Sequence, residues 1–168
     1  MNRTIGFFLS SLICLLVLVG CSDKEEDVAG EFLLGNFGFT PNENETYHIV
    51  VPIEWTGKEP VNIVSLELIK GEEEPITLEE DGISYEFFGA DPLKTTGIYG
   101  DSDIGDLTNL KNLVIDGEGK LVLKLKTSKV QADNERRVKI KFSINSKEIE
   151  KIVKWKTLEQ LTTKQQGN

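Results

Sequence analysis

The stretch "YHIVVPIEW", Tyr47–Trp55, alternates along its length between apolar side chains and a more mixed set. The odd positions are all apolar: Tyr47, Ile49, Val51, Ile53 and Trp55. Successive side chains of a strand point to opposite faces, so this pattern predicts a strand that buries its odd face. On that strand His48 points away from the core, and we expect its imidazole to be solvated.

The same alternation recurs at short intervals along the chain, which predicts further strands. The segments are Glu31–Phe39, Val61–Lys70, Ile83–Phe87, Lys120–Thr127 and Val138–Ile144. The last of these runs into "INSKE", a turn signal, and apolar residues continue to Trp155. Glu148–Trp155 is also compatible with a helical turn, but we favour a hairpin.

Seven or eight short strands without a long helical pattern favour an all-β fold, namely a two-sheet β-sandwich. We expect the topology to be an immunoglobulin-like Greek key. The Cys…Trp…Cys pattern of antibody domains is missing, so this similarity concerns architecture only. The sandwich is predicted over residues 31–157, and residues 158–168 are predicted to be a polar, frayed tail.

One long connection, residues 89–119, shows little alternation. Irregular connections of this length are uncommon in compact domains and are often functional. Within it we expect Asp106 to cap a short helix. Three leucines of that helix would cover one end of the sandwich: Leu107, Leu110 and Leu113.

The N-terminus carries one cation, Arg3, and then an apolar run over Ile5–Gly20. This run is shorter than the roughly 20 residues that a membrane-spanning helix needs, but it suits the core of an export signal. It ends in Leu18-Val19-Gly20-Cys21 and is followed by the acidic sequence "SDKEED". This segment resembles the signal peptide and lipobox of bacterial lipoproteins.

The resemblance implies that residues 1–20 are removed between Gly20 and Cys21, and that Cys21 carries a diacylglyceryl group. Two acyl chains suffice for stable anchoring, so the membrane is the first expected partner. Residues 21–30 would then form a lipidated, acidic tether. The expected location is the outer face of the bacterial cell membrane; lysine bias and scarce cysteine favour a Gram-positive source, and a Gram-negative source would mean the outer membrane.

The composition excludes several chemistries. The chain has one histidine, two cysteines and one methionine, and removal of residues 1–20 leaves His48 and Cys21 as the only such residues. Metal sites built on His, Cys or Met ligands are therefore not expected. A Ser-His-acid triad would have to use His48. We expect no cofactor and no enzymatic activity.

The acidic turn "DSDIGD" offers a weak metal candidate, with Asp101, Asp103 and Asp106 as calcium ligands. It does not match the EF-hand pattern, because Gly105 and Asp106 occupy the fifth and sixth positions. A surface turn is the alternative interpretation. A carboxylate-based hydrolase centred on residues 89–119 stays open as a further alternative, although no acidic pair stands in an apolar setting.

Charge is strongly segregated along the chain. Residues 21–119 hold 5 lysines against 23 acidic residues, whereas residues 120–156 hold 12 basic against 4 acidic residues. Most of these cations oppose apolar faces, so they would form a basic ladder if their three strands shared a sheet. The possible polyanion contacts are Lys124, Lys126, Arg137, Lys139, Lys141, Lys154 and Lys156.

Two interpretations of these cations compete. They cover a solvent face and discourage edge pairing, or they bind a polyanion such as anionic lipid or wall polymer. The overall net charge of −9 makes nucleic acid an unfavourable partner. The function predicted from the sequence is a non-enzymatic binding or scaffolding module of the cell envelope. The alternatives are a polyanion-binding module, an inhibitor or immunity-type lipoprotein, and a calcium-dependent module or hydrolase.

Overall fold

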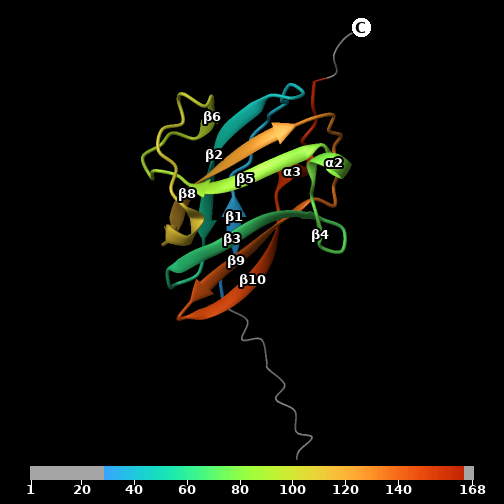
Figure 1. Ribbon diagram of the computed structural model, residues 1–168. Coiled ribbons are helices and arrows are strands. Elements are labelled where there is room, and N and C mark those ends of the chain that lie inside the picture. The colour runs from blue at the N-terminus through green and yellow to red at the C-terminus, as the bar shows by residue number, and fades with distance from the viewer. Residues whose placement is uncertain (1–28, 165–168) are drawn as a thin grey trace, which may run out of the picture.

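The computed structural model describes residues 29–164, which fold into two antiparallel sheets packed against each other (Figure 1). The first sheet has the strand order β1-β2-β8-β5, and β6 pairs with the free part of β2 beyond β1. Its strands are β1 (Phe32–Leu34), β2 (Thr46–Trp55), β5 (Ile83–Gly89), β6 (Gly97–Tyr99) and β8 (Glu118–Thr127).

The second sheet has the order β10-β9-β3-β4, with β7 also paired to β3. Its strands are β3 (Val61–Lys70), β4 (Glu74–Pro75), β7 (Val114–Ile115), β9 (Arg137–Ile144) and β10 (Lys147–Lys154). Three short helices complete the domain: α2 (Leu78–Asp81), the 3₁₀ turn η2 (Leu110–Asn112) and α3 (Lys156–Glu159).

The strand order confirms the predicted two-sheet sandwich with an immunoglobulin-like Greek key. Lettered along the chain, β1-β2-β8-β5 follows the order A-B-E-D, and β10-β9-β3 follows G-F-C. The long connection of residues 90–117 joins β5 to β8 and is an insertion between strands D and E. It contains β6, η2 and β7, so it adds short strands to both sheets.

The core lies between the sheets and is centred on aromatic rings. The ring centroid of Phe32 lies 4.8 Å from that of Trp55 and 5.1 Å from that of Phe142, the latter edge-to-face. Such tilted contacts are favourable for aromatic pairs. Both tryptophans are buried with their indole N–H satisfied: Trp55 donates to the carbonyl of Glu59, and Trp155 to that of Gly35.

The predicted hairpin at the end of the sandwich is confirmed. β9 and β10 pair antiparallel from Ile144↔Lys147 onward. The two turn residues, Asn145 and Ser146, both have positive φ, at 50° and 66°. A two-residue turn of this kind matches the twist of the strands it joins, and asparagine tolerates the left-handed conformation well.

The predicted strand over Glu31–Phe39 is correct only for its first part. β1 ends at Leu34, and the chain then leaves β2 to run beside the segment that follows β10. There the side chain of Thr157 accepts a hydrogen bond from Phe37 N–H and donates one back to the Phe37 carbonyl. The apolar alternation of this segment thus continues into the core after the ladder to β2 has ended.

The prediction of a frayed tail from residue 158 is wrong for the described part. Leu158 and Leu161 are 2% and 3% exposed, because the turn of α3 places both against the core. The hydroxyl of Thr163 accepts from Val130 N–H, and Lys164 N–H donates to the Pro41 carbonyl. Residues 165–168 lie outside the described residues.

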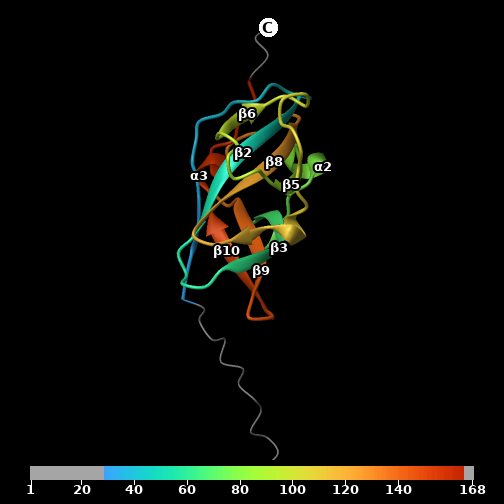
Figure 2. The ribbon, with the colours of Figure 1, turned by 90° about the vertical axis from the view of Figure 1, so that its left-hand side faces the viewer.

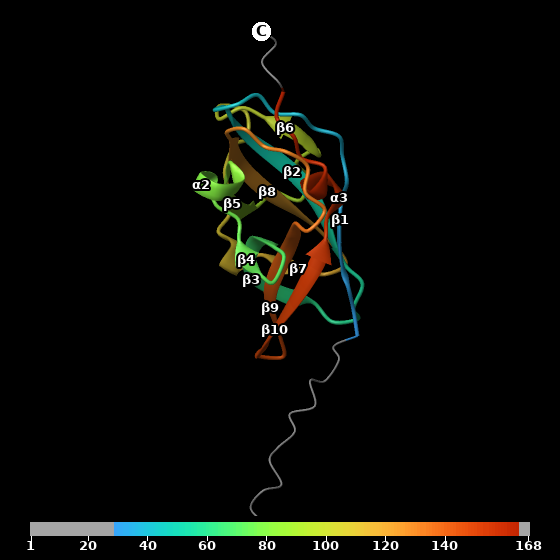
Figure 3. The same ribbon diagram turned by 90° about the vertical axis from the view of Figure 1, so that its right-hand side faces the viewer.

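Residues 29 and 164 lie at opposite ends of the molecule, as the three ribbon views agree (Figures 1, 2 and 3). The β9–β10 turn lies at the end that holds residue 29, and β6 lies toward the other end. The predicted signal peptide, Gly20, Cys21 and the tether as far as residue 28 fall outside the described residues. Within residues 29–164, no helix is long and apolar enough to cross a membrane.

Candidate functional site

The insertion covers the outer face of the first sheet, and we call its first part, residues 90–108, the strap. The strap leaves β5, passes over the sheet to pair as β6 with β2, and returns to a bridge between Gly89 and Thr108. Beneath it lies a second apolar cluster, distinct from the main core. Its buried members are Val50, Ala90, Ile104 and Val122, with Phe88, Tyr99 and Leu107 packed against them.

The strap explains why the expectation for His48 is wrong. The parity prediction holds, since His48 points away from the main core, but its side chain is buried at 4% exposed because the strap lies over it. On the sheet it stands between Lys124 of β8 and Tyr99 of β6. Its Nδ1 lies 3.2 Å from Oδ1 of Asp101 but has no hydrogen-bond partner among the described residues.

Lysine side chains hold the strap to itself and to the sheet. The ammonium of Lys94 lies 4.5 Å from the centroid of the Tyr99 ring, a cation–π distance, and donates to the Asp103 carbonyl over 2.7 Å. Lys120 of β8 donates from its Nζ to the carbonyl of Lys94. The side chains of Lys94, Tyr99 and Lys120 are thus engaged within the molecule, which favours a stable conformation of the strap.

A groove of about 500 Å³ lies between the strap and the β1–β2 edge of the first sheet. Apolar side chains line one part of it and charged side chains another; the chief ones are Leu33, Pro52, Pro92, Glu54, Glu118 and Lys120. Leu33 is half exposed, and Leu93, which follows the lining residue Pro92 in the chain, is 89% exposed. A mixed, concave surface with exposed leucines at its margin is suited to binding a ligand or a partner.

The three aspartates predicted as calcium ligands do not converge. Asp101 stands beside His48, Asp103 accepts from the hydroxyl of Ser102, and Asp106 lines a small cavity with Asp91 and Lys94. Among residues 29–164, no group of three or more His, Cys, Asp or Glu side chains is placed to hold a metal ion.

Asp106 does not cap a helix, in contrast to the expectation. Asn109 does, with its side chain accepting from Lys111 N–H, and the helix is the single 3₁₀ turn η2. Leu110 and Leu113 pack against the main core as predicted, whereas Leu107 packs under the strap.

The predicted basic ladder is divided between the two sheets. Lys124 and Lys126 lie on β8 in the first sheet, whereas Arg137, Lys139 and Lys141 lie on β9 in the second. Lys154 ends β10 and Lys156 begins α3. The strands do not share a sheet, because β8 pairs with β2 and β5 while β9 pairs with β3 and β10.

Carboxylates neutralise most cations of the second sheet. Lys139 lies 3.3 Å from Glu73 and 3.7 Å from Glu67, and a hydrogen bond with Glu73 raises the pKa of Lys139. Lys141 lies 2.8 Å from Glu148, whose hydrogen bond raises the pKa of Lys141. Arg137 likewise pairs with Glu159. The cations of this face are therefore paired with carboxylates, as is common on a solvent-exposed protein surface.

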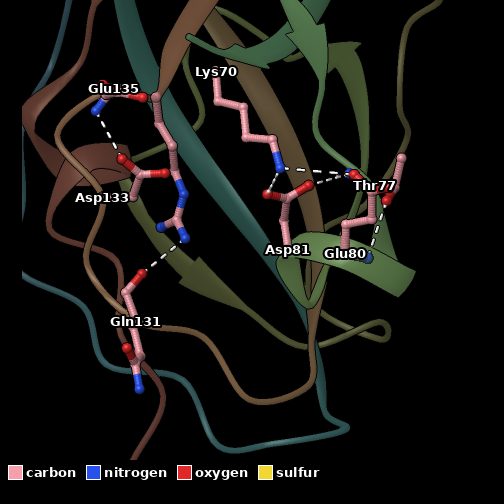
Figure 4. A network of polar contacts seen from close by, with 8 residues as sticks. Lys70, Thr77, Glu80, Asp81, Gln131, Asp133 and Glu135 are labelled. Atoms are coloured by element: carbon pink, nitrogen blue, oxygen red, sulfur yellow. Dashed lines mark hydrogen bonds and ion pairs between the residues drawn. The ribbon is translucent and has the colours of Figure 1, made fainter.

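A polar network joins β3 to α2 around the buried carboxylate of Asp81 (Figure 4). Asp81 of α2 accepts from the ammonium of Lys70 over 2.8 Å and from Thr77 N–H over 2.9 Å. Burial acts to raise the pKa of Asp81, but these two hydrogen bonds outweigh it and hold the pKa below its usual value. The network holds α2 against the end of β3.

Arg136 performs a similar structural task for the C-terminal segment. Its guanidinium is buried and donates to three carbonyls, those of Gln131, Leu158 and Leu161. Burial lowers its pKa, and its Nε has no hydrogen-bond partner among the described residues. These bonds tie the end of the chain to the β8–β9 connection.

Comparison of the chain with protein-family models, with curated proteins and with solved structures found no match. The argument about function therefore depends on the residues themselves. Sequence patterns had indicated that residues 89–119 are unusual, but not that they would bury His48. Nothing in the spacing of His48 and Asp101, 53 positions apart, could have shown that they meet.

Proposed function

We propose that this protein is a lipid-anchored, extracytoplasmic lipoprotein that acts as a non-enzymatic binding or scaffolding module of the cell envelope. One observation supports the proposal: the lipobox-like sequence Leu18-Val19-Gly20-Cys21 precedes the β-sandwich by only a short acidic stretch. Diacylated cysteine anchors a chain stably to a bilayer. A sandwich held in this way presents its surface to other components of the envelope.

The arrangement of the sandwich supports this role. The described chain begins at one end, beside the β9–β10 turn, while β6 and the strap lie toward the other end (Figure 1). An anchor that precedes residue 29 would leave the strap facing away from the membrane. The groove beside the strap would then be accessible to envelope partners.

The anchor is tested by mass spectrometry of the protein purified from cell membranes. We expect the mature N-terminal peptide to begin at Cys21 and to carry a diacylglyceryl group. Cys21→Ala should leave the signal uncleaved, whereas Cys14→Ala is the matched control and should be processed normally. A mature chain with unmodified Cys21, or normal processing of Cys21→Ala, would contradict the proposed anchor.

The binding role is tested by photo-crosslinking in cells that make the full chain. A crosslinking amino acid at Leu93 stands at the groove margin, and one at Glu59 stands at the opposite, β2–β3 end of the sandwich. We expect a discrete product from position 93 that does not form from position 59. Equal labelling from both positions, or none from position 93, would contradict a binding surface at the strap.

A second candidate is a polyanion-binding or anionic-lipid-binding module. It is favoured by Lys124 and Lys126, which have no ion-pair partner among the described residues. Each cation near an anionic surface contributes about 1 kcal/mol within a Debye length. Binding of the chain to phosphatidylglycerol vesicles at rising salt concentration tests this candidate. Binding should fall steeply as salt rises, and the double variant Lys124→Gln/Lys126→Gln should bind much more weakly. Salt-independent binding would reject this candidate.

A further inference from the structure

β10 forms one edge of the second sheet and is long for an edge strand of this domain (Figure 3). It runs for eight residues, Lys147–Lys154, and pairs on one side with β9. The other edge strands are shorter or are bonded at their ends: β1 and β6 have three residues each, β4 and β7 have two each, and β5 is bonded to Thr77 and Thr108. An edge strand with unpaired backbone groups is a template for pairing with another chain.

The free edge of β10 presents the backbone of alternate residues. A two-residue turn is closed by the pair that flanks it, so Ile144 and Lys147 exchange hydrogen bonds. Because bonding alternates along an antiparallel ladder, every second residue from Glu148 onward turns its N–H and C=O away from β9. Among residues 29–164, these outward backbone groups have no hydrogen-bond partner.

The open stretch of this edge ends at Lys154, because the chain beyond it is covered. The indole N–H of Trp155 donates to the Gly35 carbonyl, and the Thr157 hydroxyl exchanges hydrogen bonds with the backbone of Phe37. A second chain can therefore pair with β10 only as far as Lys154.

The outer face of the open stretch carries an apolar side chain between two opposite charges. Ile152 is 49% exposed, with Glu150 two positions before it and Lys154 two positions after it. Glu150 and Lys154 are exposed, and neither has an ion-pair partner among residues 29–164. An exposed isoleucine flanked in this way is suited to a contact that supplies both an apolar neighbour and counter-charges.

The neighbours on β9 do not supply these counter-charges. Glu150 stands opposite Lys141, but that ammonium already lies 2.8 Å from Glu148. Lys154 stands opposite Arg137, which is a like charge. A carboxylate on the free side of Lys154 would offset this unfavourable pair.

Antiparallel pairing of β10 with a second copy makes the stretch complementary to itself. Residues whose backbone faces the edge must pair with one another, which limits the registers. Pairing centred on Glu150 sets two carboxylates face to face, and pairing centred on Lys151 sets two ammonium groups face to face. Pairing centred on Ile152 sets the two isoleucines together, and it places Glu150 of each copy opposite Lys154 of the other.

Lysine on an edge strand ordinarily opposes pairing, because it meets another cation or an apolar neighbour. In the register centred on Ile152, the outer-face lysine meets a carboxylate instead. On the inner face, Lys151 stands opposite Val153 of the other copy, while its ammonium lies 3.3 Å from Glu31 of its own chain. The lysines of β10 therefore do not prevent this one register.

We propose that the partner of β10 is a second copy of this chain, joined by antiparallel pairing centred on Ile152. The two sandwiches then share one continuous sheet across a two-fold axis, through backbone hydrogen bonds of Glu150, Ile152 and Lys154. The contact is short, so the association is weak and depends on concentration. The inference goes beyond the proposed binding role and depends neither on the lipid anchor nor on the groove beside the strap.

Disulfide formation tests the register. The full chain, with Cys14→Ala and Cys21→Ala and purified in dodecyl maltoside, receives one new cysteine at a time. Opposite residues of a hydrogen-bonded antiparallel pair have Cα atoms ~5.5 Å apart, within reach of a disulfide, so Ile152→Cys should yield a covalent dimer on mild oxidation. Glu148→Cys, the matched control, stands roughly 26 Å from its twin in this register and should yield none. Equal dimer from both variants, or none from Ile152→Cys, overturns the proposal.

Charge exchange tests the side chains. Glu150→Lys and Lys154→Glu each set like charges opposite one another twice in the dimer, and each should raise the dimer dissociation constant about two- to thirtyfold. The double variant Glu150→Lys/Lys154→Glu restores opposite charges and should dimerise like the wild type, as should the control Glu118→Lys outside β10. Sedimentation equilibrium in density-matched detergent measures the constant, and near-UV circular dichroism establishes that each variant is folded.

Two outcomes of this measurement overturn the proposal. One is a wild-type chain that stays monomeric at about 1 mM, where even weak association is detectable. The other is a double variant that dimerises no more tightly than the single variants. Either outcome leaves crosslinking from position 93 and processing at Cys21 unaffected, so the proposed function is judged separately.

Discussion

The hydroxyl of Tyr85 bridges the two sheets at their edges, because it accepts a hydrogen bond from Leu68 N–H over 3.0 Å. Burial is the main reason that the pKa of Tyr85 is raised, and the hydroxyl stays protonated over the physiological range. The order of strands places β3 and β5 at corresponding edges of the two sheets, and η2 packs against both strands beside this bond.

Removal of this hydroxyl should weaken the fold modestly. Tyr85→Phe leaves Leu68 N–H without its partner, so we expect the free energy of unfolding to fall by about 1 kcal/mol in urea denaturation. Tyr99→Phe is the control, because its hydroxyl bonds the Thr95 carbonyl within the exposed strap. A larger loss in Tyr99→Phe than in Tyr85→Phe would show that the two sheets are not held by this bond.

Asp81 should make the fold sensitive to acid. Its folded pKa lies below the unfolded value of about 3.9, so its contribution is present above that pH and disappears as the pH falls through the folded pKa. We expect wild-type stability to drop more steeply than that of Asp81→Asn between about pH 5 and pH 2. Thermal unfolding across this range measures both slopes, and parallel slopes would contradict the assignment.

The C-terminal segment should contribute to global stability. Leu161→Ala removes a side chain that is 3% exposed, and we expect it to cost about 2–5 kcal/mol in chemical denaturation. Lys156→Ala on the exposed face of α3 should cost less than about 0.5 kcal/mol. Equal stability of the two variants would show that residues 158–164 behave as a tail that does not stabilise the fold.

The strap should open independently of the sandwich. Ile104→Ala removes an anchor of the second apolar cluster, so amides of residues 97–107 should exchange about ten- to a hundredfold faster, while those of β9 stay unchanged. Asp103→Ala, at an exposed position of the same turn, is the control. Hydrogen exchange read by mass spectrometry distinguishes the regions, and equal acceleration in β9 would mean that the strap opens only on global unfolding.

Much of the sandwich follows from local patterns. The parity of β2 correctly identified the side chains that face the main core, and the turn signal at Asn145 correctly predicted the β9–β10 hairpin. Both succeed because they depend on neighbours in the chain. Alternation reports which face a side chain occupies, and positive φ at two turn residues sets the register.

The candidate sites were harder to predict. His48 was expected in solvent because alternation cannot show that a strap forty or more residues later covers the second face. Whether the lysines of β8 and β9 formed one ladder depended on a shared sheet, and strand order is absent from the periodicity.

The sequence by itself determined the fold class of this protein, the faces of its strands and its resemblance to bacterial lipoproteins at Cys21. These properties depend on hydrophobic periodicity and on a short contiguous motif, so they are readable without coordinates. The tertiary structure alone decided that the strap buries His48, that carboxylates neutralise the cations of β9, and that the Tyr85 hydroxyl bonds Leu68 of the other sheet. Each of these is set by contacts between segments distant in the chain, and local chemistry does not encode their pairing.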